Sequence, residues 1–280
     1  MLLRCGDKTL SLDHALVMGV VNVTPDSFSD GGRFYDTATA VAHGRQLQAE
    51  GAAILDIGGE STRPGAPEVS VEEELRRVLP VIEQLRAATT AVISIDTSKP
   101  EVMRAAVAAG AGLINDVRAL REPGALAIAA QTGCAICLMH MQGEPRTMQQ
   151  NPTYRDVAGE VKAFLDERVR AARAAGIPAD RITVDPGFGF GKTLEHNLEL
   201  LRRLRELTSG EVPLLAGLSR KSMIGKLTGR PERDRVYGSI ALAVIAYQNG
   251  ARIIRAHDVA ATVDALKVAE AVAVAADRAK

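Results

Sequence analysis

The stretch ITVDPGFGFGKT, Ile182–Thr193, runs from a short β-branched segment through a glycine-rich turn to the start of a helix. Its Gly-Lys-Thr ending is typical of a nucleotide phosphate loop. Such a loop needs a glycine five positions before Gly191, and Pro186 stands there, without the backbone N–H that a phosphate requires. The dinucleotide pattern G-x-G-x-x-G also fails, because its last glycine falls on Lys192. The stretch is therefore a strand-to-helix connection whose chemically informative residue is Asp185.

The same order of strand and helix recurs about eight times along the 280 residues. Each unit opens with a continuous apolar run, as expected for strands buried on both faces of a parallel sheet. The runs are Leu16–Val23, Ala53–Gly59, Ala91–Thr97, Gly112–Val117, Ala135–His140, Ile182–Gly187, Pro213–Ser219 and Ala251–His257. About eight such units in about 250 residues predict a TIM (β/α)8 barrel, an α/β fold; a doubly wound open sheet is the alternative.

Amphipathic segments lie between the apolar runs. Residues 70–88 begin with Ser70 and Glu73, spaced as a helix capping box, and the helical pattern from residue 156 onward stops at Gly176. Residues 2–13 are predicted to form an N-terminal β-hairpin that turns at Gly6 and Asp7. No linker or low-complexity segment marks a boundary, so residues 1–280 are expected to form a single domain.

The composition, 46% hydrophobic and 24% charged, is that of a soluble globular protein. The net charge of +0 argues against nucleic acid or a membrane surface as partner. We find no signal peptide and no apolar stretch near the roughly 20 residues of a membrane span, so we expect a cytoplasmic protein. Cys5, Cys134 and Cys137 are expected to be buried free thiols, and the last two face opposite sides of a strand.

Polar residues stand at the end of nearly every predicted strand, where a TIM barrel holds its chemistry. They are Asn22, Glu60, Thr62, Arg63, Asp96, Asn115, Asp116, His140, Asp185, Ser219, Arg220, Lys221, Arg255 and His257. A helix cap or loop hydrogen bond explains any one of them, but not a whole ring of them at one mouth. The short acids and amide among them, Asp96, Asn115 and Asp185, suit a flat heterocycle with paired N–H donors.

A second group, Arg63, Arg255 and His257, is cationic or can be, and suits a phosphate or pyrophosphate. Two long loops rich in Gly, Pro and Ser follow the first two strands, and loops of this length are often lids. Phe28, in the first loop, and Phe190 are candidates for packing on a ligand, since aromatic residues make up only 3% of the chain. The sequence contains no serine–histidine–acid set and no zinc-ligand spacing.

The segments NVTPDSFSDGG, DIGGESTRPGA, SIDTSKP, INDV, MHMQGEPRTMQ, DPGFGFGK, GLSRKSMIG and RAHDV follow one another over nearly the whole chain. In type, order and spacing they resemble the dihydropteroate synthases of bacterial folate biosynthesis. The resemblance implies a TIM barrel that joins 6-hydroxymethyl-7,8-dihydropterin pyrophosphate to p-aminobenzoate. It also implies Mg²⁺ as cofactor and a homodimer.

The resemblance assigns roles position by position. The implied pterin-binding residues are Thr62, Asp96, Asn115, Asp185, Lys221 and Arg255. The implied pyrophosphate-binding residues are Asn22, Arg63, Arg255 and His257, with Asn22 also contacting the metal. The implied p-aminobenzoate-binding residues, in the region where sulfonamides compete, are Phe28, Thr62, Pro64, Phe190, Ser219 and Ser222. The implied catalytic residues are Arg63, Asp96, Lys221, Arg255 and His257.

Pyrophosphate leaves from a methylene beside a ring nitrogen that can share positive charge, so a dissociative, cation-like substitution is expected. The attacking aryl amine is neutral at pH 7 and needs no strong base, which agrees with the missing nucleophile–base pair. Two alternatives share the pterin acids: a pterin-dependent methyltransferase barrel and a non-catalytic pterin-binding paralogue. The presence of Asn22, Arg63, Arg255 and His257 favours the synthase.

Overall fold

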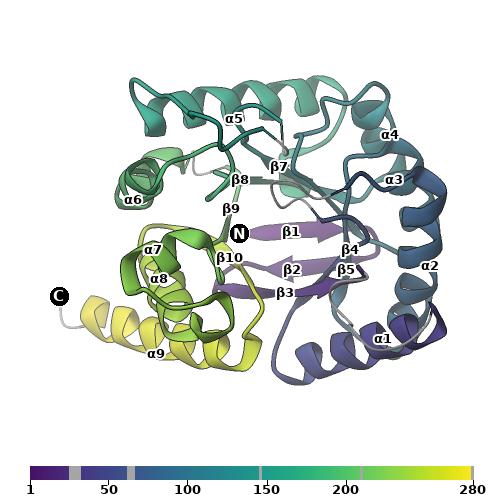
Figure 1. The fold of residues 1–280 in the computed structure, drawn as a ribbon, viewed down its shortest axis with the longest axis horizontal. Coiled ribbons are helices and arrows are strands. Elements are labelled where there is room, and N and C mark those ends of the chain that lie inside the picture. Colours follow the sequence, from purple (N-terminus) through teal and green to yellow (C-terminus); the bar gives the residue numbers. More distant parts are fainter. Residues whose placement is uncertain (25–32, 62–66, 145–146, 209–210, 279–280) are drawn as a thin grey trace.

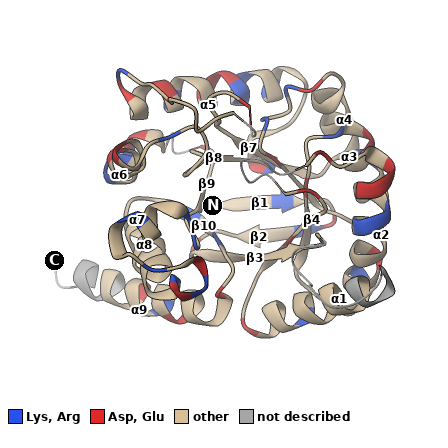
Figure 2. Cartoon of the chain, in the orientation of Figure 1, with Lys and Arg blue, Asp and Glu red and all other residues tan. Residues whose placement is uncertain are grey.

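The computed structural model describes residues 1–24, 33–61, 67–144, 147–208 and 211–278, with the side chains of 33–36 and 274–278 left aside. Four residues predicted for the site lie outside the described residues: Phe28, Thr62, Arg63 and Pro64. Within the described part, no helix has the length and apolar character needed to cross a membrane. Acidic and basic positions are interspersed along the helices and loops rather than gathered by sign (Figure 2).

Eight parallel strands close into a barrel in the order β10-β3-β4-β5-β6-β7-β8-β9, which confirms the predicted TIM barrel. Their bounds are β3 (Leu16–Asn22), β4 (Ile54–Gly58), β5 (Val92–Asp96), β6 (Leu113–Asp116), β7 (Ala135–Met139), β8 (Ile182–Asp185), β9 (Leu214–Gly217) and β10 (Ala251–Ala256). Each predicted apolar run contains one of these strands. The runs extend beyond the strands at their C-terminal ends, where the chain leaves the sheet.

Helices surround the barrel (Figure 1). They are α1 (Arg33–Ala49), α2 (Val71–Ala88), α3 (Pro100–Ala108), α4 (Ala125–Thr132), α5 (Val157–Ala174), α6 (Leu194–Arg202), α7 (Ser222–Thr228), α8 (Val236–Gln248) and α9 (Val259–Arg278), with short 3₁₀ turns η2 (Ala179–Arg181), η3 (Leu204–Leu207) and η4 (Glu232–Asp234). The predicted box at the start of α2 is only half formed. Ser70 Oγ accepts from the backbone N–H of Glu73, but the Glu73 carboxylate pairs with Arg76 and Arg77. After α5, Gly176 has φ +94°, as predicted for a helix stop.

The N-terminal hairpin closes one end of the barrel. Strands β1 (Leu2–Cys5) and β2 (Lys8–Ser11) pair antiparallel around Gly6, whose φ is +63°, as the sequence predicted. The hairpin residues Leu3 and Cys5 are buried in one cluster with residues from the starts of the barrel strands, among them Ile54 and Val92. Because this end is filled with apolar side chains, the opposite, C-terminal end is left for chemistry.

The inner face of the barrel changes character along each strand, because side chains two positions apart share a face. On β4 this face runs from the buried Ile54 to Asp56, and on β5 it runs from Val92 through Ser94. The cysteines obey the same geometry: Cys134 packs in the layer between strands and helices, and Cys137 packs in the inner cluster. All three cysteines are buried free thiols, as expected.

Candidate active site

An arginine held between two carboxylates forms the centre of the polar end of the barrel. Arg255 Nε lies 2.6 Å from Asp56 Oδ2, and Arg255 Nη2 lies 2.9 Å from Asp96 Oδ2. Burial works to lower the pKa of Arg255, but the charges of Asp56 and Asp96 outweigh it and raise that pKa further above its usual range. Burial, followed by the charge of Asp56, raises the pKa of Asp96 to about 7, against the opposing effect of Arg255.

Asp56 is the residue that sequence reasoning missed. It is fully buried, and besides Arg255 it accepts from Ser94 Oγ at 2.7 Å and from Asn115 Nδ2 at 3.0 Å. Asn115 is nearly buried and donates its amide N–H to Asp56, which leaves its amide oxygen as an acceptor. The available signal was a lone carboxylate inside the otherwise apolar run AILDIGG.

Asn22, Gly58 and Asp96 stand side by side across β3, β4 and β5. Gly58 has no side chain, and a Cβ placed there would lie 3.9 Å from both Asn22 Oδ1 and Asp96 Oδ2. The glycine therefore leaves room between an amide oxygen and a carboxylate. Asn22 is half-buried at the end of its strand.

Asp185 ends β8 and is nearly buried. Its Oδ1 accepts from the backbone N–H of Gly187 at 2.7 Å. Burial raises the pKa of Asp185, and the Gly187 N–H and then the charge of Lys221 work against that rise. Gly187 has φ +69°, and a Cβ there would come within 1.9 Å of His140 O, so only glycine lets the chain turn here.

The turn after Asp185 carries Phe190 to the site. Phe190 packs on a mainly methionine cluster made of Val117, Met139, Met141 and Met148. Lys221 Nζ lies 4.2 Å from the centre of the Phe190 ring, a cation–π contact. Lys192 and Thr193 were predicted to open the next helix; Thr193 caps α6, whereas Lys192 lies outside that helix and is buried.

His257 follows β10 and bonds to Ser219. The backbone N–H of His257 lies 3.1 Å from Ser219 Oγ, and its Nδ1 lies 3.0 Å from the same oxygen. Burial, then the charges of Arg255 and Arg220, lower the pKa of His257 to about 3. His257 is therefore a neutral ring that can donate one N–H.

Arg220 has a structural role next to Lys221. Its φ is +57°, a rare conformation for a residue with a side chain. Its Nε and Nη2 bond to the two carboxylate oxygens of Asp258 at 3.0 and 2.5 Å, and its backbone N–H donates to Ser239 Oγ at 2.9 Å. These contacts tie the loop after β9, which carries Lys221, to the start of α9 and to α8.

Other members of the polar ring organise loops. Asp116 is buried and accepts from Ser98 Oγ and from the backbone N–H groups of Arg118 and Leu120. Glu60 pairs with Lys99, which also bonds to the buried Glu74. His140 faces Lys192. Ser222 is exposed as the first residue of α7.

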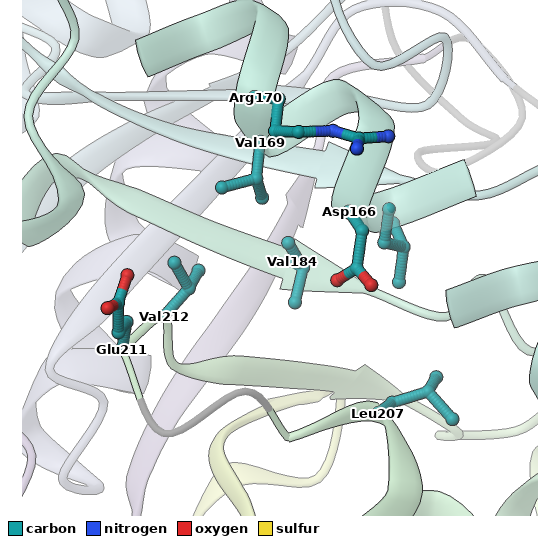
Figure 3. A pocket seen from close by; sticks show the side chains of 8 residues that line it. Asp166, Val169, Arg170, Val184, Leu207, Glu211 and Val212 are labelled. Atoms are coloured by element: carbon teal, nitrogen blue, oxygen red, sulfur yellow. The ribbon is translucent and has the colours of Figure 1, made fainter. Parts of the chain in front are cut away.

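A cavity of about 290 Å³ lies elsewhere, on the outer wall of the barrel (Figure 3). It lies between α5 and the region of β8 and β9. Its lining residues are Leu165, Asp166, Val169, Arg170, Val184, Leu207, Glu211 and Val212. Of the predicted site residues that the structure describes, none lines it, so the side-chain geometry at the barrel mouth defines the candidate active site.

Comparison with known proteins gives one answer. A family profile described as "Pterin binding enzyme" matches residues 18–257. The dihydropteroate synthase of Escherichia coli is 54% identical over 263 residues, covering 94% of this chain and 93% of the relative. The Xanthomonas albilineans dihydropteroate synthase solved with 4-aminobenzoic acid superposes with a TM-score of 0.92 at 58% identity, covering 97% of both chains. The same enzyme in complex with 7,8-dihydropteroate gives a TM-score of 0.89 at 55% identity, covering 97% of this chain and 98% of the other. The chain belongs to the dihydropteroate synthase family of pterin-binding enzymes.

Proposed function

We propose that the polar end of this barrel joins 6-hydroxymethyl-7,8-dihydropterin pyrophosphate to p-aminobenzoate, giving 7,8-dihydropteroate and pyrophosphate. The observation that carries the proposal is the buried cluster of Arg255, Asp56 and Asp96, with Asn115 and Asp185 on neighbouring strands. The hydrogen-bond donors and acceptors of this cluster suit a flat heterocycle. The reaction itself is inferred from the related dihydropteroate synthases.

The pterin is held by acids and amides on rigid strand ends. Asp185, as an ionised acceptor, takes the ring N–H and the 2-amino group, and Asn115 offers its amide oxygen to another ring edge. Lys221 donates to a ring acceptor, and the planar guanidinium of Arg255 lies over the ring face. Thr62 is assigned to the same site and lies outside the described residues.

The substitution is dissociative, and the protein stabilises the two charges that separate. Asp96 bonds to Arg255 in the central cluster. We propose that its carboxylate also stabilises the positive charge that develops on the pterin. On the leaving pyrophosphate, His257 donates its single ring N–H from Nε2, since Nδ1 accepts from the Ser219 hydroxyl, and Arg255 supplies positive charge. Arg63 is proposed to act with them. Asp96, Lys221, Arg255, His257 and Arg63 therefore make up the proposed catalytic set.

Mg²⁺ fits this site as an ion held mainly by the substrate. Within the described residues, no group of three or more His, Cys, Asp or Glu side chains is placed to hold a metal. Asn22 offers one neutral amide oxygen beside Gly58, which suits an ion that takes most of its ligands from pyrophosphate oxygens and water. Bound there, Mg²⁺ would supply positive charge to the leaving group.

The p-aminobenzoate subsite lies around Phe190. The ring of Phe190 and the ammonium of Lys221 offer an aromatic surface with a positive charge above it. Ser222, at the start of α7, supplies a hydroxyl for the carboxylate. Ser219, two residues after β9, is assigned to the same subsite, where its hydroxyl donates to His257 Nδ1 and holds that ring. Phe28, Thr62 and Pro64 are assigned to this subsite as well. The aryl amine attacks in its neutral form, so no general base is required.

The proposal extends to assembly and location. Helix α8 exposes apolar side chains, with Tyr237 83% exposed and Ile245 41% exposed, and this supports a homodimer formed partly through α8. The hairpin and the barrel bury a common cluster, which supports a single domain over residues 1–280. The three free thiols are compatible with a reducing cytoplasm.

The test is turnover by the purified protein. With both substrates and Mg²⁺ it should release pyrophosphate and form 7,8-dihydropteroate in equal amounts. Tight pterin binding without turnover would instead identify a non-catalytic paralogue. Methyl transfer from a methylated pterin to a corrinoid would identify the methyltransferase alternative.

A further inference from the structure

Lys192 is the lysine of the Gly-Lys-Thr sequence, and its ammonium is turned into the protein. The residue is 3% exposed. Its Nζ lies 3.0 Å from each of three atoms: His140 Nδ1, Gly187 O and Phe190 O. An ammonium has three N–H donors, so this environment offers one partner for each.

The charges of this pair agree with the hydrogen bonds. Burial, followed by the charge of Lys192, lowers the pKa of His140 to about 3, so His140 is neutral and its Nδ1 can accept. Burial lowers the pKa of Lys192 to about 7, and Asp185 opposes that effect. Lys192 can donate to both carbonyls and to the ring in its charged form.

The turn from Gly187 to Gly191 depends on side chains for its shape. Gly187, Gly189 and Gly191 all have positive φ, a run that continues neither the strand before it nor the helix after it. Two further side-chain hydrogen bonds hold the second half of the turn: Gln149 Nε2 donates to Gly189 O at 2.6 Å, and Tyr154 Oη donates to Gly191 O at 2.8 Å.

Lys192 differs from Gln149 and Tyr154 because it bonds to two carbonyls of the turn, those of Gly187 and Phe190. One of its carbonyl partners belongs to Gly187, whose N–H binds Asp185. The other belongs to Phe190, whose ring lies under Lys221.

We propose that Lys192 is a positioning residue that fixes the p-aminobenzoate platform, Phe190 with Lys221, relative to the pterin acceptor Asp185. The inference rests on the roles proposed above for Asp185, Phe190 and Lys221. Asp185 is also anchored by β8, whereas the backbone of Phe190 belongs to the turn and only its ring is held from outside, by the methionine cluster. Loss of Lys192 therefore disturbs the second substrate more than the first.

The test is Lys192→Met, which keeps a similar side-chain length and removes all three donors. The KM for p-aminobenzoate should rise at least tenfold, while the Kd for the dihydropterin pyrophosphate changes less than threefold. Lys192→Gln retains two amide N–H donors and should recover part of the loss. Lys8→Met is the matched control, because Lys8 also donates to two backbone carbonyls, Thr90 O and Ala91 O, at the hairpin end of the barrel.

The thermal midpoint is measured for every variant. Lys8→Met should lower stability without changing the KM for p-aminobenzoate. An unchanged KM in Lys192→Met, or equal losses for both substrates, overturns the proposal. If Lys192→Met does not fold, Lys192→Gln and Tyr154→Phe decide, and a wild-type KM in both overturns it. Wild-type protein is assayed first, so that a chain without any turnover is recognised as a failure of the proposed function itself.

Discussion

Replacing Asp56 by Asn tests the central cluster with little change of shape. An amide at this position can keep the geometry of the hydrogen bonds. Its oxygen can accept from Arg255 Nε and Asn115 Nδ2, and its NH₂ can donate to Ser94 Oγ, because a hydroxyl can accept as well as donate. The substitution therefore removes mainly the negative charge beside Asp96.

The size of the effect follows from the electrostatics of two carboxylates around one guanidinium. Two unit charges about 4 Å apart interact by about 4 kcal/mol at an effective dielectric near 20. Arg255 lies between them and offsets part of this repulsion, so we expect Asp56→Asn to lower the pKa of Asp96 by about one to two units. Exchanging a charge-assisted bond to Arg255 for a neutral one costs about 1 kcal/mol more, or about fivefold in rate.

The assay is the pH dependence of kcat/KM for the dihydropterin pyrophosphate, followed by pyrophosphate release. If ionised Asp96 is the active form, wild-type activity rises with pH through the region near 7, where the pKa of Asp96 lies. In Asp56→Asn this rise should move to lower pH, and the plateau should fall about fivefold. Asp180→Asn, which breaks a surface pair with Arg4 at the far end of the molecule, should change neither.

Two results would contradict this prediction. One is an acid limb that stays in place in Asp56→Asn. The other is an acid limb that survives unchanged in Asp96→Asn, because the titrating group would then be a different one. Stability gives a parallel check. The folded-state pKa of Asp96 is raised, so its contribution is fully present below pH about 4 and is lost as the pH rises through about 7. Asp56→Asn should flatten that slope.

Three further substitutions probe the surrounding structure. Asp185→Asn should weaken pterin binding at least tenfold in calorimetry with a near-normal thermal midpoint; unchanged affinity would remove Asp185 from the site. Gly187→Ala places a Cβ 1.9 Å from His140 O at positive φ and should lower the free energy of unfolding by about 3 kcal/mol or more in urea, and a loss below 1 kcal/mol would contradict the geometry. Asp258→Asn weakens the bidentate contact with Arg220 and should lower both stability, by about 1–2 kcal/mol, and kcat; normal kcat in a destabilised protein would make this contact purely structural.

The fold was accessible from the sequence because its signals are local and repeat. Each apolar run contains a strand, since a strand covered on both faces has little place for polar residues. The hairpin around Gly6 could likewise be predicted from its local sequence. The sequence was less reliable where one side chain has two possible partners. Glu73 fits a capping box with Ser70, but Arg76 and Arg77 one turn later compete for its carboxylate.

The site could be predicted only in part, because it is formed by contacts between strands that are distant in the sequence. Asp96, Asn115 and Arg255 were predicted from their places at strand ends, and the structure brings them together around Asp56. Asp56 lies two residues before the end of β4, inside an apolar run, so a search for polar residues at strand ends did not select it. Lys192 was predicted to open a helix, since the sequence does not show that His140 lies against it across 52 residues.

The arrangement of the acids explains why a cation-like reaction suits this mouth. In the free protein, burial and the neighbouring Asp56 make the ionised form of Asp96 unfavourable, which is why its pKa is raised. In the proposed reaction, a positive charge that develops on the pterin would relieve this penalty, whereas the neutral ring of the substrate would not. The stabilisation is therefore larger in the transition state than in the ground state, which is the condition for acceleration rather than tight binding. With a single acid, the ionised form of Asp96 would be less unfavourable, and less free energy would be recovered when the cation forms. Asp56 adds this repulsion and also bonds to Arg255.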